Sequence, residues 1–115
     1  MYRILVIDKD PLRKEFYTQV FSLLDLQFFI HNGVDERDPS RNLTIFLIDD
    51  LKPDFVLIET TAFPELKNDE FYQEIMKRPN IHFLHREGEN WPGENFVYPL
   101  NPEVFLQVIR KKLHG

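Results

Sequence analysis

Polar side chains stand directly after several short apolar runs of this sequence. These polar residues are Asp8, Lys9, Asp10, Glu59, Thr60, His85 and Tyr98. Tyr98 is followed by a proline, Pro99, which we include in the candidate site. Carboxylates can hold a divalent cation or take part in phosphoryl transfer, and a histidine can act as a base or a metal ligand. The elements that bring these side chains together decide which of these reactions is open to the chain.

The histidines do not form a metal-binding pattern. His82 and His85 lie three residues apart in one apolar run, so in a strand their side chains point to opposite faces. We therefore expect His85 to be a strand-end residue bonded to a backbone carbonyl or an acid. The chain contains no cysteine, which excludes thiolate catalysis and cysteine-based zinc sites. We expect neither a metal ion nor a cofactor.

The apolar runs themselves predict a parallel sheet. They are nearly continuous instead of alternating, as is typical of strands buried on both faces. The expected strands are 3–7, 27–30, 54–58, 81–84 and 95–98. Helical spacing of apolar residues fills most of the intervals, with expected helix starts at 10–11, 39–40, 68–70 and 101–103. Alternating strands and helices predict a doubly wound α/β fold with five parallel strands.

One interval breaks this alternation. Residues 86–94 contain two glycines and a proline, and they are too few for a crossover helix with its turns. We therefore predict that the fourth crossover helix is missing and that a loop replaces it. Trp91 lies in this loop. It either folds back over the sheet, which we favour because an exposed ring would leave an apolar patch, or it is exposed for a partner.

Composition limits the classes of protein that the chain can belong to. It has 115 residues, of which 43% are hydrophobic, and a net charge of −5. This length suits a single domain spanning 1–115. The acidic balance argues against a nucleic-acid-binding surface, and the short apolar opening is neither a signal peptide nor a membrane span. We expect a cytoplasmic protein without nucleic-acid or membrane partners.

The order and spacing of these elements resemble the receiver domains of bacterial two-component response regulators, which have a flavodoxin-like fold. The resemblance is carried by the stretches 4–12, 52–59 and 98–103 and extends over nearly the whole chain. It implies a regulatory domain that accepts a phosphoryl group on an aspartate after the third strand. In this family two acids after the first strand bind Mg²⁺, a Thr or Ser ends the fourth strand, and a Lys-Pro pair follows the fifth.

Most of these signature positions are altered. Asp8 matches the first acid, but Lys9 stands at the second acid and Glu59 at the acceptor aspartate. His85 replaces the Thr or Ser, and Tyr98 replaces the Lys. Tyr98 keeps the following proline, Pro99, and the resemblance predicts a cis bond between them.

The acceptor position depends on the register. Counting forward from Pro53 places Glu59 there, whereas counting backward from Pro64 places Thr60 there. We favour Glu59 because the forward count runs through a strand without gaps. Neither register supplies an aspartate.

Lys9 brings a positive charge to the expected metal site, where it removes an oxygen ligand and repels a divalent cation. Its ammonium group either pairs with Asp8 and Glu59 in place of the metal or extends into solvent. Both alternatives disfavour phosphorylation by the usual chemistry, in which a metal ion neutralises the transferred group.

These substitutions predict a pseudo-receiver, a domain that binds a protein partner without being phosphorylated and is not an enzyme. The alternative is a small Mg²⁺-dependent phosphatase or phosphotransfer domain that uses Asp8 and Asp10. The stretch 4–10 resembles the opening motif of haloacid-dehalogenase-type phosphatases, although Pro11 and Leu12 fit that motif poorly. A homodimer and a fused carboxyl-terminal output domain both remain open.

Overall fold

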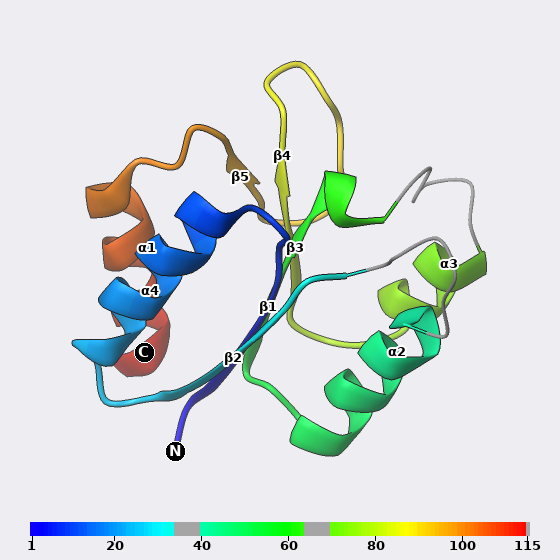
Figure 1. The fold of residues 1–115 in the computed structure, drawn as a ribbon, viewed down its shortest axis with the longest axis horizontal. Coiled ribbons are helices and arrows are strands. Elements are labelled where there is room, and N and C mark those ends of the chain that lie inside the picture. The colour runs from blue at the N-terminus through cyan, green and yellow to red at the C-terminus, as the bar shows by residue number, and fades with distance from the viewer. Residues whose placement is uncertain (34–39, 64–69, 115) are drawn as a thin grey trace.

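Five parallel strands form one sheet through the middle of the molecule (Figure 1). The computed structural model describes residues 1–33, 40–63 and 70–114. Within these ranges the strands are β1 (Arg3–Ile7), β2 (Gln27–His31), β3 (Phe55–Glu59), β4 (Ile81–His85) and β5 (Phe96–Val97). Their order is β2-β1-β3-β4-β5, and every neighbouring pair is parallel. The predicted doubly wound sheet is therefore confirmed.

Helices cover both faces of this sheet. They are α1 (Pro11–Ser22), α2 (Ser40–Leu51), α3 (Glu70–Met76) and α4 (Pro102–His114), with a short 3-10 turn, η1 (Thr60–Ala62), after β3. Figure 1 shows α1 and α4 on one side of the sheet and α2 and α3 on the other. No helix among the described residues is long and apolar enough to cross a membrane.

The helix starts follow from capping side chains. Asp10 caps α1 by accepting a hydrogen bond from the backbone N–H of Arg13 at 2.9 Å, and Pro11 is the first helical residue. Asn101 caps α4 in the same way, because its side chain accepts from the N–H groups of Glu103 and Val104. Such caps satisfy backbone donors that have no partner within the helix. Parts of two expected helix starts, residue 39 for α2 and residues 68–69 for α3, lie outside the described ranges.

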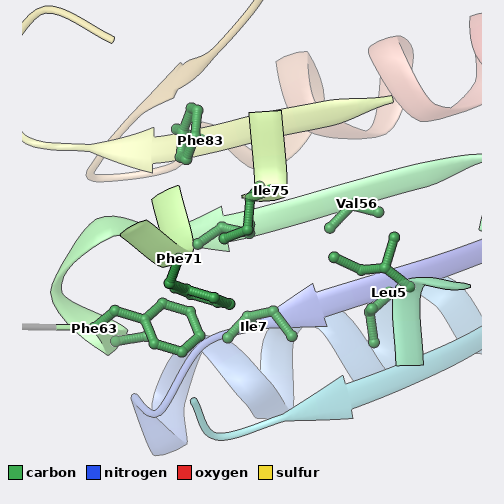
Figure 2. Packing of buried hydrophobic residues seen from close by; sticks show 10 residues of the cluster. Leu5, Ile7, Val56, Phe63, Phe71, Ile75 and Phe83 are labelled. Atoms are coloured by element: carbon green, nitrogen blue, oxygen red, sulfur yellow. The ribbon is translucent and has the colours of Figure 1, made fainter. Parts of the chain in front are cut away.

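Successive side chains of a strand point to opposite faces of the sheet, so the core is divided into two clusters, one on each face. One contains Leu5, Val56 and Phe83 and packs under α2 and α3 (Figure 2). The other contains Val6, Leu57, Leu84 and side chains of α1 and α4, including Tyr17 and Phe105. Full burial of each large apolar side chain contributes about 1.5–3 kcal/mol. Because both faces of the sheet are packed in this way, the polar residues at the ends of its strands are held in fixed positions.

Candidate functional site

Asp8 follows β1 and is completely buried. Its Oδ2 accepts hydrogen bonds from Arg13 Nε and from the Tyr17 hydroxyl, both at 2.8 Å. Its Oδ1 accepts from the backbone N–H of Asp10 at 3.0 Å and from Arg13 Nη2 at 3.3 Å. Both oxygens are therefore occupied by donors, and the carboxylate charge is compensated by a two-point contact with the guanidinium.

Arg13 is the cation of this site. It lies in the first turn of α1, where the Asp10 cap fixes the start of the helix beside the end of β1. The guanidinium carbon also lies 5.2 Å from the centroid of the Tyr98 ring. Partial burial alone would lower the pKa of Arg13, but the hydrogen bond and charge of Asp8 outweigh it and raise that pKa. The guanidinium is thus permanently charged and belongs to the site around the buried Asp8 carboxylate, which we call the pocket.

Tyr17 closes the inner side of the pocket, one helical turn beyond Arg13. It is completely buried, and its hydroxyl donates to Asp8. Burial raises the pKa of the Tyr17 phenol, and the charge of Asp8 and the hydrogen bond to it raise it further. The phenol therefore stays protonated and keeps its role as a donor at neutral pH.

Glu59, the last residue of β3, is also buried, with an exposed fraction of 1%. Its carboxylate turns onto the following residues and caps η1. Oε1 accepts from the backbone N–H of Thr61 at 3.0 Å, and Oε2 accepts from the Thr61 hydroxyl at 2.5 Å. Thr60, the alternative acceptor, begins η1, and Pro64 lies outside the described residues. The acid at the acceptor position is therefore engaged by its own turn.

Lys9 does not supply the cation of the pocket. Its side chain is exposed, and the structure assigns the ion pair with Asp8 to Arg13. The physical reason is direction: Asp8 continues the buried strand, whereas Lys9 is already in the turn that leads to α1. Of the two alternatives for Lys9, exposure to solvent is the one observed.

His85 and Tyr98 occupy the remaining altered positions. His85 is buried, and its Nδ1 lies 2.8 Å from the carbonyl oxygen of Arg86, as expected for a strand-end histidine. The Tyr98 hydroxyl accepts from Arg86 Nε at 3.0 Å, and the bond between Tyr98 and Pro99 is cis, as predicted. Among the described residues no three His, Cys, Asp or Glu side chains come together in a way that could hold a metal ion.

A surface pocket of about 250 Å³ lies beside Arg13. Apart from Arg13, its lining is apolar or aromatic: Leu12, Phe16, Tyr98, Pro99, Leu100 and Pro102. The lining of this hollow includes no carboxylate, the side chain that usually holds Mg²⁺ in proteins.

The linker between β4 and β5 contains no helix, which confirms the predicted loop. The ring of Trp91 lies 4.8 Å from that of Phe83 and 6.0 Å from that of Tyr72, centroid to centroid. Trp91 therefore folds back onto the core cluster under α2 and α3, as the favoured prediction stated. Its alternative role as a partner-binding residue stays a prediction.

Sequence reasoning missed Arg13, Tyr17 and Asn95. A signal for the first two was present, because the predicted cap at Asp10 places residue 13 in the first turn beside Asp8. Asn95 had no comparable signal. Its Oδ1 accepts from the N–H of Phe83 at 2.9 Å, and its Nδ2 donates to the carbonyl of Trp91 at 2.8 Å. This one side chain fastens the linker to the sheet.

Solved structures show what this arrangement is similar to. The signal receiver domain of a modulated diguanylate cyclase from Desulfovibrio desulfuricans G20 has a TM-score of 0.69 and 14% identity, covering 97% of this chain and 93% of that one. A response regulator in red light signaling of R. palustris has a TM-score of 0.66 and 14% identity, covering 99% and 92%. The chain has the receiver-domain fold.

A third similar structure is the N-terminal domain of a response regulator/sensory box/GGDEF three-domain protein from Carboxydothermus hydrogenoformans. Its TM-score is 0.65 at 12% identity, and the match covers 97% of this chain and 94% of that one. No protein-family model and no curated protein sequence matches this chain. At these identities the likeness to receiver domains establishes the fold, and function has to be argued from the pocket.

Proposed function

We propose that residues 1–115 form a single receiver-type domain that regulates a protein partner without being phosphorylated. The observation that carries this proposal is the occupation of both Asp8 oxygens by Arg13 and Tyr17. In phosphorylated receivers the corresponding acid binds Mg²⁺. Here a side chain of the protein itself supplies the compensating positive charge.

The pocket does not fit Mg²⁺. This ion requires nearly octahedral oxygen ligands and is usually held by one or two carboxylates. The Asp8 carboxylate is already saturated, Lys9 stands in place of the second acid, and Glu59 caps η1. A metal ion entering this site would have to displace a bidentate guanidinium from a buried carboxylate.

The acceptor position is also unsuited to phosphoryl transfer. A glutamate side chain is longer than an aspartate by one methylene, about 1.5 Å, and in-line attack depends on positions held within a fraction of that distance. Both Glu59 oxygens are bonded to Thr61. Tyr98 replaces the lysine that would stabilise the transferred group, and its hydroxyl is bonded to Arg86.

No observation favours the phosphatase alternative that would use Asp8 and Asp10. The Asp10 carboxylate accepts from the backbone N–H of Arg13 and serves as a helix cap. Hydrogen bonds from a cation and a phenol to both oxygens of Asp8 lower the nucleophilicity of its carboxylate. Lack of hydrolysis of an aryl phosphate in Mg²⁺ buffer is the expected result, for the wild-type chain and for Asp10→Asn alike.

In this proposal the partner of the domain is a protein, and the domain acts in the cytoplasm without contacting nucleic acid or lipid. Support comes from the fold, because receiver domains are regulatory modules. The similar domain from Carboxydothermus hydrogenoformans belongs to a three-domain protein. A fused output domain is one form that such a partner can take.

The proposal is tested by offering the chain a small phosphodonor. Acetyl phosphate with Mg²⁺ is expected to leave the intact mass unchanged, and beryllofluoride to leave the amide spectrum unchanged. A phosphorylatable receiver treated in parallel serves as the positive control. A mass gain of one phosphoryl group that disappears in Glu59→Gln would show that the pocket is active and would overturn the proposal.

A further inference from the structure

Strand β2 forms one edge of the sheet, and no described strand lies beyond it. Its residues Gln27–His31 include no Lys, Arg, Asp, Glu or Pro, and they pair with β1 residue for residue, without a bulge. Proteins usually protect long edge strands with charges, prolines or bulges, because an open edge invites another strand. Within Gln27–His31 the edge of β2 has none of these protections.

The hydrogen bonds to β1 show which backbone groups of β2 point outward. The N–H of Gln27 donates to the carbonyl of Tyr2 at 2.9 Å, and the carbonyl of His31 accepts from the N–H of Asp8 at 3.0 Å. In a parallel strand, successive residues turn their N–H and C=O groups to alternate sides. Phe28 and Ile30 therefore direct their backbone donors and acceptors toward the open edge.

We propose that this edge pairs with the same edge of a second copy of the chain, in antiparallel orientation about Phe29. Phe28 then lies opposite Ile30 of the second copy, and each such pair exchanges two N–H···O=C bonds. The order of residue types, polar–apolar–apolar–apolar–polar, reads the same in both directions. Such a strand complements itself, as the isologous interface of a two-fold dimer requires.

Side chains next to this edge favour a second copy over solvent. Phe29 lies on the same face as Leu5, the face covered by α2, yet it remains 39% exposed. On α2, Leu43 and Phe46 are 44% and 59% exposed. Antiparallel pairing at a non-hydrogen-bonded position brings the two Phe29 rings against each other. This interface is independent of the closed pocket and holds whether or not the domain is phosphorylated.

The proposal is tested by measuring the mass of the 115-residue chain in solution by sedimentation, from micromolar to sub-millimolar concentration. The wild-type chain is expected to dimerise as its concentration rises. Phe29→Lys places two ammonium groups face to face at the symmetry axis and is expected to be monomeric, as is Phe29→Glu. An equimolar mixture of these two variants is expected to form the dimer again.

A matched control and a second measurement make the outcome decisive. Leu23, the residue that follows α1, is 83% exposed, so Leu23→Lys introduces the same ammonium group outside β2 and is expected to dimerise normally. Amide exchange at Phe28 and Ile30 is expected to slow as the concentration rises. A wild-type chain that stays monomeric at the highest concentration would overturn the proposal, as would a Phe29→Lys variant that still dimerises.

Discussion

Two regions of this molecule differ from the receiver pattern that the sequence resembles, and they do so by different means. At the end of β1, the Arg13 guanidinium pairs with Asp8, the residue to which that resemblance assigns a metal ion. Between β4 and β5, residues 86–95 replace a crossover helix, with Trp91 packed on Phe83 and Asn95 bonded to the strand. The first replacement depends on charge, whereas the second depends on aromatic packing and neutral hydrogen bonds.

This difference indicates how each region responds to change. The pocket joins β1 to α1 through a buried carboxylate, so its stability depends on keeping the opposite charge in place. The linker holds no buried ion pair among its described contacts, so its stability depends on filled volume and satisfied backbone groups. Substitutions that change charge should therefore act mainly on the pocket, and substitutions that change volume mainly on the linker.

The largest effect is expected from Arg13→Met. It removes the cation and leaves the Asp8 carboxylate buried with only part of its hydrogen bonds, which should lower the free energy of unfolding by about 3 kcal/mol. Urea unfolding measures this loss. The double variant Asp8→Asn/Arg13→Met should recover most of it, because the buried charge is then absent.

Arg86→Met is the matched control for Arg13→Met. Arg86 is exposed and donates to the Tyr98 hydroxyl, so its loss should change stability little. Equal losses in the two arginine variants, or no recovery in the double variant, would contradict the assignment of Arg13 as the cation of the pocket.

A smaller loss is expected from Trp91→Ala. The indole is half-buried against Phe83 and Tyr72, so removing it should cost about 2 kcal/mol, less than a fully buried tryptophan. Trp91→Phe keeps an aromatic ring at this position and should lose less. Adding Asp8→Asn should not relieve this loss, unlike that of Arg13→Met, and equal relief in both variants would remove the distinction between the two regions.

The smallest effect concerns pH and His82, which stacks on Phe55 and lies 2.6 Å from the Glu94 carbonyl through Nδ1. Burial lowers the pKa of His82, and the nearby Lys112 lowers it further, against the raising effect of Glu94. Because the folded-state pKa lies below the unfolded value of about 6.5, the unfolded state binds more protons as pH falls. Stability should therefore decrease as pH drops below that value.

Thermal unfolding of the wild-type chain and of His82→Gln across this range measures the His82 contribution. The variant should lose less stability between neutral and mildly acidic pH than the wild type. His114→Gln, at the exposed end of α4, should behave like the wild type. A parallel pH response in all three chains would exclude His82 as the titrating group.

The fold could be predicted from the sequence because its signals are local. Continuous apolar runs indicate buried parallel strands, and the Asp10-Pro11 cap indicates the start of α1. The absence of a fourth crossover helix also followed from residues 86–94, whose length and composition exclude one. Each of these inferences needs only residues that are neighbours in the chain.

The bonds inside the pocket could not be predicted with the same success. Lys9 is adjacent to Asp8 in the sequence, but backbone direction sends its side chain to solvent, while Arg13 reaches Asp8 from the next element. The Glu59 carboxylate accepts hydrogen bonds from Thr61, two residues later in the chain, and within the described part of the chain makes no hydrogen bond or ion pair with Asp8 or Lys9. The partner of a buried carboxylate depends on where the neighbouring helix lies and on side-chain direction. The spacing of charged residues in the sequence predicts neither of these.

Titration of the chain with Mg²⁺, followed through the backbone amides of Lys9, Asp10 and Thr60, tests most directly whether Arg13 closes the pocket. We expect no saturable shift of these amides in the millimolar range, because the Asp8 oxygens are already occupied. Saturable shifts at these three amides, lost in Asp8→Asn, would mean that Mg²⁺ displaces the guanidinium and would contradict a phosphorylation-independent receiver.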